Sequence, residues 1–523
     1  MAFRDITSKI EYPAGTSARF RRLDAYDRLL DGTLYDHLKH PFSHEFDGQN
    51  HVRLENRRPS VVYNLARMIA DQTSALAFGD GHAPHVRCWD EAGDENPFAK
   101  TEEAIESLID ACDIFGTMTE AVFRGSVGSC AIKVRALPSG LPRVSVVRGK
   151  YARPVYDVAD PTALLGLIQV YPTLGADLAQ YGYDNIDDEK TYWIRIELGK
   201  KEERWFLPLA DDDYQKLGQK DAIGKTIEWA IDRDRTYTHG FSVVPAVWIR
   251  NISGEGIDGQ ATFGQIVDMC VEIDYTLSQI GRGIKYTMDP LLVVRKGELA
   301  SSLPVGGGMT SEGNFVKDPS NVMVLPAGAM AELLEINGKG FETSREYVRL
   351  LREYALEIVG GMKSDAETTK AAQSGRALEL LHQALVWLVG RLRGSYGDLG
   401  FVPLLKILLG GLRDGVIRLP GIVASTIDLD APIRLVWPSW WQPRGADLLA
   451  EAQAFESLIG GGKSGVPVLP RNTVTRAAAM SLNLTDPNRV VGEMDTQRAD
   501  DDHAEQAAPK DDAPLDDEST DDK

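Results

Sequence analysis

The sequence predicts an α+β fold that is mostly helical and carries a long, projecting pair of helices. Three observations predict it. Helical and strand-like stretches are mixed before about residue 251. From Phe263, apolar residues recur at alternating spacings of three and four over about 25 residues, as in a helix roughly 37 Å long. A second stretch with helical periodicity, at 341–359, follows a segment of short strands and glycine-rich turns.

Length and composition predict a globular chain of several domains. At 523 residues and 43% hydrophobic content, roughly two to four domains are expected. The most apolar segment, ALELLHQALVWLVGRLRG, is broken by His382, Arg391 and Arg393, so a buried helix is expected there and no membrane span. The N-terminus lacks the apolar core of a signal peptide, which favours intracellular synthesis. The four cysteines have no CxxC spacing, which predicts reduced core residues.

The first half predicts three helices and then a strand-rich part. The helices are expected at 17–40, at 59–79 and at about 99–117, the second opened by Pro59 and closed by Gly79. An alternating stretch punctuated by Pro-Ser-Gly predicts a hairpin before Asp157. Further strands are predicted at 163–172, 191–198 and 203–208, and the segment FSVVPAVWIRN closes this part near residue 251.

The central unit is predicted to be a helix out, a small β tip and a helix back. The tip strands are expected at Leu291–Arg295 and Val322–Leu325. Such a protrusion needs neighbours for its helix faces, and side-by-side copies of the chain would supply them. The apolar seam of the outgoing helix consists of Phe263, Ile266, Cys270, Ile273, Leu277, Ile280 and Ile284, and the returning helix carries Tyr347, Leu351, Tyr354 and Ile358.

The segment after the returning helix has two interpretations. Gly360-Gly361 precede the polar stretch MKSDAETTKAAQ, and a helical pattern restarts at Ser374. It is either a helix-to-helix connector or a mobile loop that exposes Lys363 and Lys370. Further on, APIRLVWPSWWQP ends a sheet, and helices are predicted at 446–459, at about 472–482 and after Asp486-Pro487.

Charge is concentrated at the C-terminus. Of the net charge of -20, the segment Asp500–Lys523 contributes -9, from eleven acidic residues against two lysines. With one leucine and no aromatic residue it is predicted to be disordered, because it cannot bury enough surface to offset its ordering entropy. The acidic body argues against tight nucleic-acid binding, which requires lysine and arginine to neutralise phosphates.

No motif makes a positive case for catalysis, so the chain is predicted not to be an enzyme and to need no cofactor or metal. GGGKSG at 460–465 ends in Lys463-Ser464, but the phosphate-loop pattern requires a glycine where Ser457 stands. The preceding segment is helical and prolines follow, so a glycine turn after a helix is favoured. His37, His40 and His44 surround Pro41 and are predicted to lie on a surface turn. Ser126 lacks the G-x-S-x-G pattern.

Over about residues 15–498, the chain resembles the portal proteins of tailed bacteriophages, the head-to-tail connectors. The resemblance lies in the order of segments and in several local patterns, without one sharp motif. It is carried by SVVYNLARMIADQTSALAFGDGHAPHVRC, by GSCAIKVRALPSGLPRVSVVRGKYARPVYD, by VVPAVWIRNISGEGIDGQATFGQIVDMCVEIDYTLSQIG and by SGRALELLHQAL.

The resemblance implies a portal-like, ring-forming architecture. Residues 1–260 and 374–443 would form the wing, with a long helix and a closing strand in the second part. Stem helices at 261–287 and 341–359 would flank a small β clip at 288–340. Residues 360–373 would be the tunnel loop, 444–498 a helical crown and 499–523 the disordered acidic tail.

The resemblance also implies a function. The family forms a ring, commonly of twelve copies, at one capsid vertex of the virion, after assembly in the host cytoplasm. Double-stranded DNA is packaged and ejected through its channel without sequence specificity. The partners are other copies of the chain, the terminase large subunit, the major capsid and scaffolding proteins, and a head-completion or adaptor protein. The candidates to face DNA are Lys363, Ser364, Thr368, Thr369 and Lys370, and those to face the terminase are Arg295, Lys296, Glu298 and Lys317.

Two alternatives are of other classes. The chain could be another head–tail adaptor or minor capsid protein, or a nucleotide-binding enzyme that uses 460–465. The segment GSYGDLG at 394–400 is a second candidate for the channel constriction, because it also interrupts a helical pattern.

Overall fold

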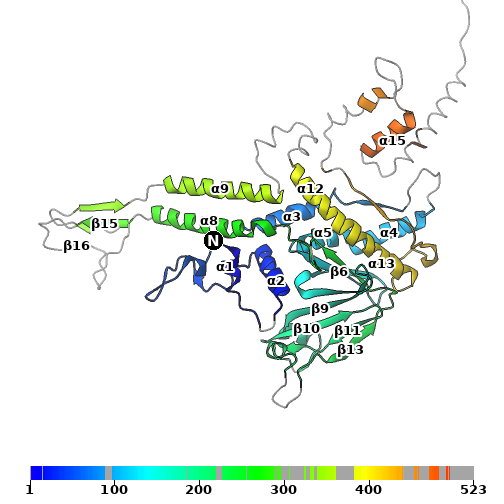
Figure 1. Ribbon diagram of the computed structural model, residues 1–523, viewed down its shortest axis with the longest axis horizontal. Helices are drawn as coiled ribbons and strands as arrows, with labels where there is room; N and C mark the ends of the chain where they lie inside the picture. The colour runs from blue at the N-terminus through cyan, green and yellow to red at the C-terminus, as the bar shows by residue number, and fades with distance from the viewer. Residues whose placement is uncertain are drawn as a thin grey trace, which may run out of the picture.

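A computed structural model shows a mixed body from which a pair of long helices projects (Figure 1). The structure describes residues 2–13, 16–88, 97–184, 186–219, 226–254, 256–288, 291–295, 305–306, 323–324, 330–334, 339–360, 382–438, 440, 453–455, 457–458, 470–481, 491–492 and 494. It confirms the predicted mixture of helices and strands.

Helices from the N-terminal quarter form much of the body. Their side chains share one hydrophobic cluster, in which Leu30, Ile69, Leu108 and Met118 are buried together with Leu405 from far along the chain. This cluster is the main core, and it also receives one end of the projecting pair. The helices are α1 (Phe3–Thr7), α2 (Ala18–Asp31), α3 (Leu65–Phe78), α4 (Ala99–Cys112) and α5 (Ile114–Gly125).

A three-stranded antiparallel sheet lies against these helices, in the order β14 (Ala246–Arg250), β6 (Ser129–Ala136) and β7 (Pro142–Arg148). Its side chains alternate between two environments, as the period of a strand requires. Ile132 and Ile249 enter the main core, whereas Ala131 and Trp248 pack against a second sheet.

The second sheet is antiparallel and covers the far face of the first. Its order is β13 (Ile231–Thr238), β11 (Glu202–Phe206), β10 (Thr191–Leu198), β9 (Leu164–Leu174) and β8 (Ala152–Tyr156), with β12 (Leu209–Ala210) also paired to β10. The strands predicted at 163–172, 191–198 and 203–208 are confirmed as β9, β10 and β11, whereas β13 was not predicted.

Shorter elements complete the body. Two pairs join distant segments: β1 (His40–Pro41) with β4 (Arg57–Arg58), and β5 (His85–Arg87) with β19 (Arg434–Val436). The others are β2 (Phe46–Asp47), β3 (Asn50–His51), α6 (Gly175–Gln180), α7 (Asp211–Tyr214) and the 3₁₀ turns η1 (Leu54–Asn56), η2 (Gly149–Tyr151), η3 (Gly264–Ile266) and η5 (Ala424–Thr426).

Two predicted helices are shorter or interrupted. The prediction at 17–40 is wrong beyond Asp31, because Gly32 adopts a left-handed conformation (φ 76°) and caps the helix. The prediction at 99–117 is wrong at Asp113 (φ 46°), where α4 ends and α5 begins. The Asp113 side chain accepts a hydrogen bond from the Gly116 amide and caps the second helix.

The helix predicted at 59–79 begins later, at Leu65. Gly79 ends it, as predicted. The segment before Asn64 is extended, because its amides bond to side chains of another helix: Ser60 and Val61 to Ser278, and Tyr63 to Asp274. Pro59 therefore does not open a helix.

A long helical run crosses the body as α12 (Gln383–Leu392), η4 (Arg393–Phe401) and α13 (Val402–Arg413). The middle part is π-helical, and its Tyr396 and Phe401 are fully buried. The segment 394–400 thus interrupts the α-helix as a π-helical stretch, and its role as a rival channel segment stays a prediction. By length and composition this run could cross a membrane (mean hydropathy 1.2), but 61% of that window is buried in the fold, as core helices are.

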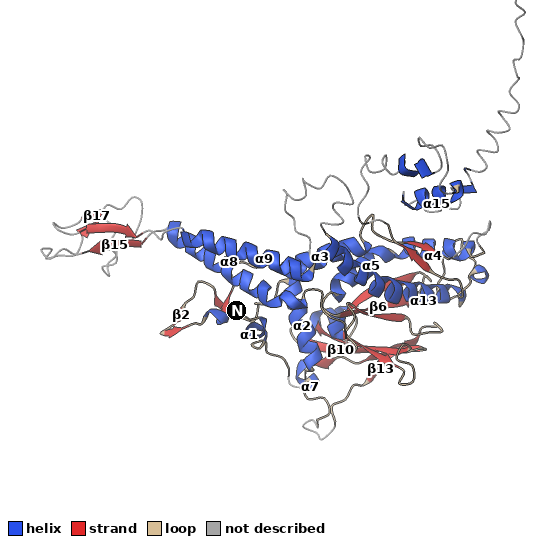
Figure 2. Cartoon of the chain, turned by 45° about the horizontal axis from the view of Figure 1, so that its top comes forward, coloured by secondary structure: helices blue, strands red, loops and turns tan. Residues whose placement is uncertain are grey.

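The projecting pair consists of α8 (Val267–Met288) and α9 (Lys339–Val359), packed side by side (Figures 1 and 2). At its far end lie β15 (Leu291–Arg295) paired with β18 (Met330–Leu334), and β16 (Val305–Gly306) paired with β17 (Met323–Val324). Of the predicted strands, the first coincides with β15 and the second overlaps β17. In the C-terminal part, α15 (Arg471–Ser481) corresponds to the helix predicted at 472–482.

Candidate functional site

The base of α8 is fixed to the body by a buried polar cluster. Asp274 accepts hydrogen bonds from the Tyr35 hydroxyl (2.8 Å) and the Tyr63 amide (2.7 Å). At the next residue, the Tyr275 hydroxyl donates to the carbonyl of Arg57 at 2.8 Å. Burial raises the pKa of Asp274 from 3.8 to about 6, although both hydrogen bonds favour the ionised form. The N-terminal segments thus hold one flank of α8 rigidly.

The predicted seam of α8 changes from buried to exposed along the helix. Phe263, Ile266, Cys270 and Ile273 are buried in the main core. Leu277 packs against its margin, Ile280 is half-buried, and Ile284 is 44% exposed. The seam therefore packs within one chain only near the body, and its distal end has apolar surface left uncovered.

The returning helix α9 has two apolar faces. Ala355, Leu356 and Val359 are buried against the main core, and Leu351 packs at its edge. On the other face lie Tyr347, Leu350, Tyr354 and Ile358, which are 37 to 51% exposed. We call these four residues the outer face of α9. The predicted stripe mixed the two faces, because it grouped Leu351 with three residues of the outer face.

The opposite flank of the pair carries a second, different apolar surface. The extended segment before α3 exposes Val61, Val62 and Tyr63, and the amides of Val61 and Tyr63 hold it against α8. Both views place α9 on one side of α8 and the N-terminal helices α1 and α2 on the other (Figures 1 and 2). An ion pair between Glu45, which lies between β1 and β2, and Arg282 also joins the N-terminal segment to α8. We call residues 61–63 the N-terminal face.

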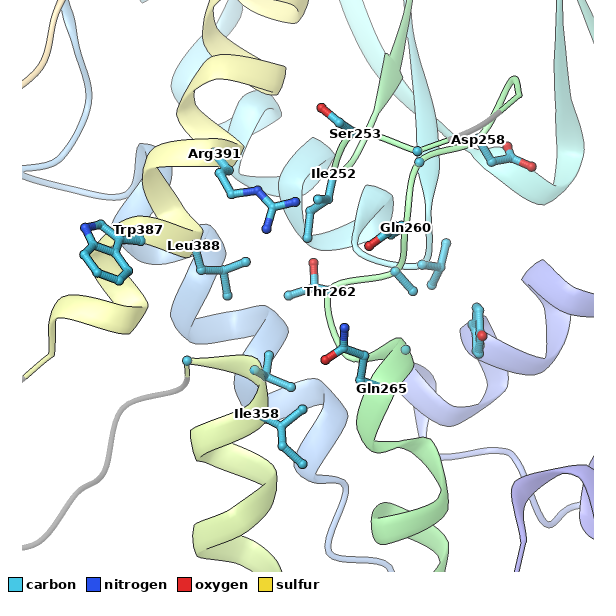
Figure 3. A pocket seen from close by; sticks show the side chains of 18 of the residues that line it. Ile252, Ser253, Asp258, Gln260, Thr262, Gln265, Ile358, Trp387, Leu388 and Arg391 are labelled. Atoms are coloured by element: carbon cyan, nitrogen blue, oxygen red, sulfur yellow. The ribbon is translucent and has the colours of Figure 1, made fainter.

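A groove of about 1150 Å³ lies where the pair joins the body (Figure 3). The loop after β14, the end of α9 and the start of α12 form its walls. Arg391 turns its guanidinium toward the groove and forms no ion pair with any described residue. Gly360 fits closely against Ala384, since a Cβ added to it would come within 2.9 Å of the Ala384 carbonyl oxygen. The end of α9 and the start of α12 therefore lie next to each other beside the groove, at Gly360 and Ala384.

Most of the residues predicted to face DNA or the terminase lie outside the described part of the chain. These are Lys363, Ser364, Thr368, Thr369 and Lys370, together with Lys296, Glu298 and Lys317. Arg295 is the exception, and it pairs with Met330 at the end of the β15–β18 ladder. The glycine turn at 460–465 also lies outside the described residues.

Leu350 and the N-terminal face were not predicted from the sequence. Leu350 stands three residues after Tyr347 and four before Tyr354, so a second apolar stripe was visible in the spacing. The run Val61-Val62-Tyr63 was assigned to a helix, which hid its exposure. The signal that could have separated it is Asn64, a strong helix N-cap residue directly after the run.

The described residues contain no group of three or more His, Cys, Asp or Glu that could hold a metal ion. Cys88, Cys112, Cys130 and Cys270 are free thiols, and burial raises the pKa of each. Compared with known proteins, the chain matches no protein-family model and no curated protein sequence.

Proposed function

We propose that the chain is a portal protein: a ring at one capsid vertex through which double-stranded DNA is packaged and later ejected. The observation that carries the proposal is the projecting pair with unlike apolar surfaces on its two flanks. One is the outer face of α9 and the other is the N-terminal face. A contact between unlike surfaces is head-to-tail, and repeated contacts of this kind close into a ring when the rotation allows it.

The energetics of the two faces favour such a contact. Full burial of one large apolar side chain stabilises by about 1.5–3 kcal/mol. The four residues of the outer face are 37 to 51% exposed, so covering them would stabilise each contact by several kcal/mol before association costs. An isolated chain leaves this surface in water.

The proposed channel segment is 360–373, with Lys363 and Lys370 as contacts for DNA phosphates. Its support is that the chain leaves the body after Gly360 and returns near His382, at the groove between α9 and α12. In a ring, each copy would contribute one such segment at the same height. Outside 500–523 the net charge is -11 (-20 less the -9 of that segment), which suits a channel wall that lets DNA slide, because a wall rich in lysine and arginine would hold it.

The proposed docking end is the β tip of the projecting pair. It is the part furthest from the body along the pair (Figure 1), and the terminase large subunit and then a head-completion protein would bind there. Capsid and scaffolding proteins would contact the body. The motor would hydrolyse ATP, so the chain itself needs neither a phosphate loop nor a cofactor.

The test is to measure the solution mass of the purified chain and to image its particles end-on. Rings of about a dozen subunits around a hole wide enough for a duplex (~20 Å) are expected. Because closure depends on concentration, the measurement is repeated over a hundredfold range of protein. A monomer at every concentration, with the outer face of α9 accessible to solvent in hydrogen exchange, would contradict the proposal.

A further inference from the structure

A second groove, of about 840 Å³, lies between the two sheets of the body. One wall is β7, the edge strand of the first sheet, and the consecutive residues Ser145–Arg148 all line the groove. The other wall includes 171–173 of β9, and β8 pairs with β9 only from Leu164 to Gln169. Both walls are therefore open strand edges, whose backbone C=O groups and N–H groups (the latter missing at Pro172) can bond with an extended segment.

The groove is lined by basic and aromatic side chains, although the chain as a whole is acidic. Asp177, which is exposed, is the single acidic residue among the lining residues. The aromatic side chains include Tyr171, Tyr183 and Trp205. The basic residues that line it are Lys133, Arg135, Arg143, Arg148 and Arg235.

Carboxylates behind the walls compensate only part of this positive charge. Lys133 and Arg135 share one carboxylate, Glu203. Arg148 pairs with Asp31, and Arg235 pairs with Asp232.

Arg143 is exposed and forms no ion pair with any described residue. Arg143 therefore has no ion-pair partner among the described residues, and the Lys133–Arg135–Glu203 cluster carries one net positive charge.

These cations are held in fixed positions. Glu203 is 1% exposed and also accepts hydrogen bonds from Trp205 Nε1 (2.9 Å) and from the Tyr237 hydroxyl (2.9 Å). The Arg135 guanidinium lies 5.7 Å from the centres of the Trp205 and Tyr237 rings, and Arg235 lies 4.0 Å from that of Tyr183. Stacked guanidinium groups are oriented before a carboxylate arrives, so less side-chain entropy is lost on binding.

We infer that this groove binds an extended acidic peptide segment, and that its occupant is the C-terminal segment 500–523 of this chain. That segment carries a charge of -9 and lies outside the described residues. Residues 495–523 span roughly 95 Å when extended at about 3.3 Å per residue. A tethered segment acts at an effective concentration on the order of millimolar, so weak ionic contacts are enough to hold it.

The same charges disfavour a nucleic acid in this groove. The chain carries a net charge of -20, so a nucleic acid in solution is repelled as it approaches. The C-terminal segment is covalently attached to the chain and does not have to overcome this repulsion to reach the groove. This inference goes beyond the proposed portal function and does not depend on it, because the segment can occupy the groove in a monomer or in a ring.

The test uses the full chain with the photoreactive residue p-benzoylphenylalanine at Ser145, on the groove wall. After irradiation, adducts mapped by mass spectrometry are expected on 500–523. The same photoreactive residue at Val155, an exposed position outside the groove, should not label that segment. Raising the salt concentration to about 0.5 M should lower the yield several-fold, because exposed ion pairs are screened.

Arg143→Gln should lower the adduct yield several-fold. The matched control is Arg153→Gln, an exposed arginine of β8 that does not line the groove, and it should leave the yield unchanged. Adducts on another segment, no adduct, or a yield insensitive to Arg143→Gln would overturn the inference. Preferential labelling of an added single-stranded oligonucleotide would also overturn it and would assign the groove to nucleic acid. None of these outcomes bears on ring formation.

Discussion

The Tyr35 hydroxyl donates a 2.8 Å hydrogen bond to Asp274, and this contact joins the N-terminal helices to the base of α8. The other carboxylate oxygen accepts the Tyr63 amide at 2.7 Å. The pair is almost completely buried, with Tyr35 and Asp274 each 2% exposed. One ionisable group therefore connects the body, the N-terminal face and the projecting pair.

Stability of this junction should depend on pH between about 4 and 6. Burial raises the pKa of Asp274 from 3.8 to about 6, so the folded chain keeps a proton that the unfolded chain has lost. Its contribution to stability is complete below about pH 4, falls as pH rises through 6, and is then constant. The change is at most about 3 kcal/mol. Hydrogen exchange of the α8 amides over this pH range measures it.

Asp274→Asn should remove that pH dependence, because the amide does not titrate and can still accept from the Tyr63 amide. Asp268→Asn is the matched control on the same helix. Asp268 lies on the surface of α8 and accepts a hydrogen bond from the Phe3 amide. Replacing it should leave the pH dependence of α8 unchanged. Equal pH profiles in wild-type and Asp274→Asn protein would show that Asp274 is not the titrating group.

Gly125→Ala should destabilise the body by about 1–3 kcal/mol, since overpacking a filled core costs this much. A Cβ at residue 125 would come within 2.0 Å of the Tyr396 hydroxyl. Gly390→Ala is the control in α12: a Cβ there meets no atom within 4 Å, and the helix should gain up to about 1 kcal/mol. Calorimetry should show a lower unfolding temperature for the first variant and an equal or higher one for the second.

Tyr396→Phe should cost about 1–3 kcal/mol, because it leaves the buried Oδ1 of Asn251 without the hydroxyl that now bonds to it at 3.0 Å. The same hydroxyl is the atom nearest to a Cβ at Gly125. The double variant Gly125→Ala/Tyr396→Phe should therefore be more stable than the sum of the single effects predicts. If calorimetry shows that the two single effects on stability simply add, then α5 moves to make room for the new methyl group and the Tyr396 ring stays in place.

Leu350→Asp should prevent association of the chain into rings, because it places a charge in the outer face of α9. Val158→Asp is the control: Val158 is fully exposed in the turn between β8 and β9, away from the projecting pair. Both variants should fold, since neither residue is buried. Mass photometry should detect rings only for the wild type and Val158→Asp, and equal assembly of both variants would exclude the outer face from the contact.

Lys463→Ala should leave both folding and ring assembly unchanged, because the glycine turn at 460–465 lacks the first glycine of a phosphate loop. Equilibrium binding of a fluorescent ATP analogue to wild-type and variant protein tests the alternative of a nucleotide-binding enzyme. Tight binding that the substitution abolishes would support that alternative against a passive channel.

Periodicity predicted the longest elements well. The spacing of apolar residues located α8 and α9, and the strands predicted at 163–172, 191–198 and 203–208 correspond to β9, β10 and β11. Helix boundaries were less predictable where distant contacts decide them. The amides of Ser60, Val61 and Tyr63 could have formed a helical turn, but side chains of α8 bind them. The interruption predicted at 394–400 is a π-helical stretch, in which Gly397 and Gly400 leave room for Trp437 and Ile249.

By itself, the sequence determined the order of elements, the projecting helix–tip–helix unit and the acidic terminus, because these depend on local spacing and composition. The tertiary structure decided which apolar residues are buried. Leu350 and Leu351 are chemically identical neighbours, yet one is exposed and the other packs at the core, because only the position of α8 defines an inner side of α9. The basic groove was also invisible in the sequence. Its cations come from β6, β7 and β13, and only the packing of the two sheets brings them together.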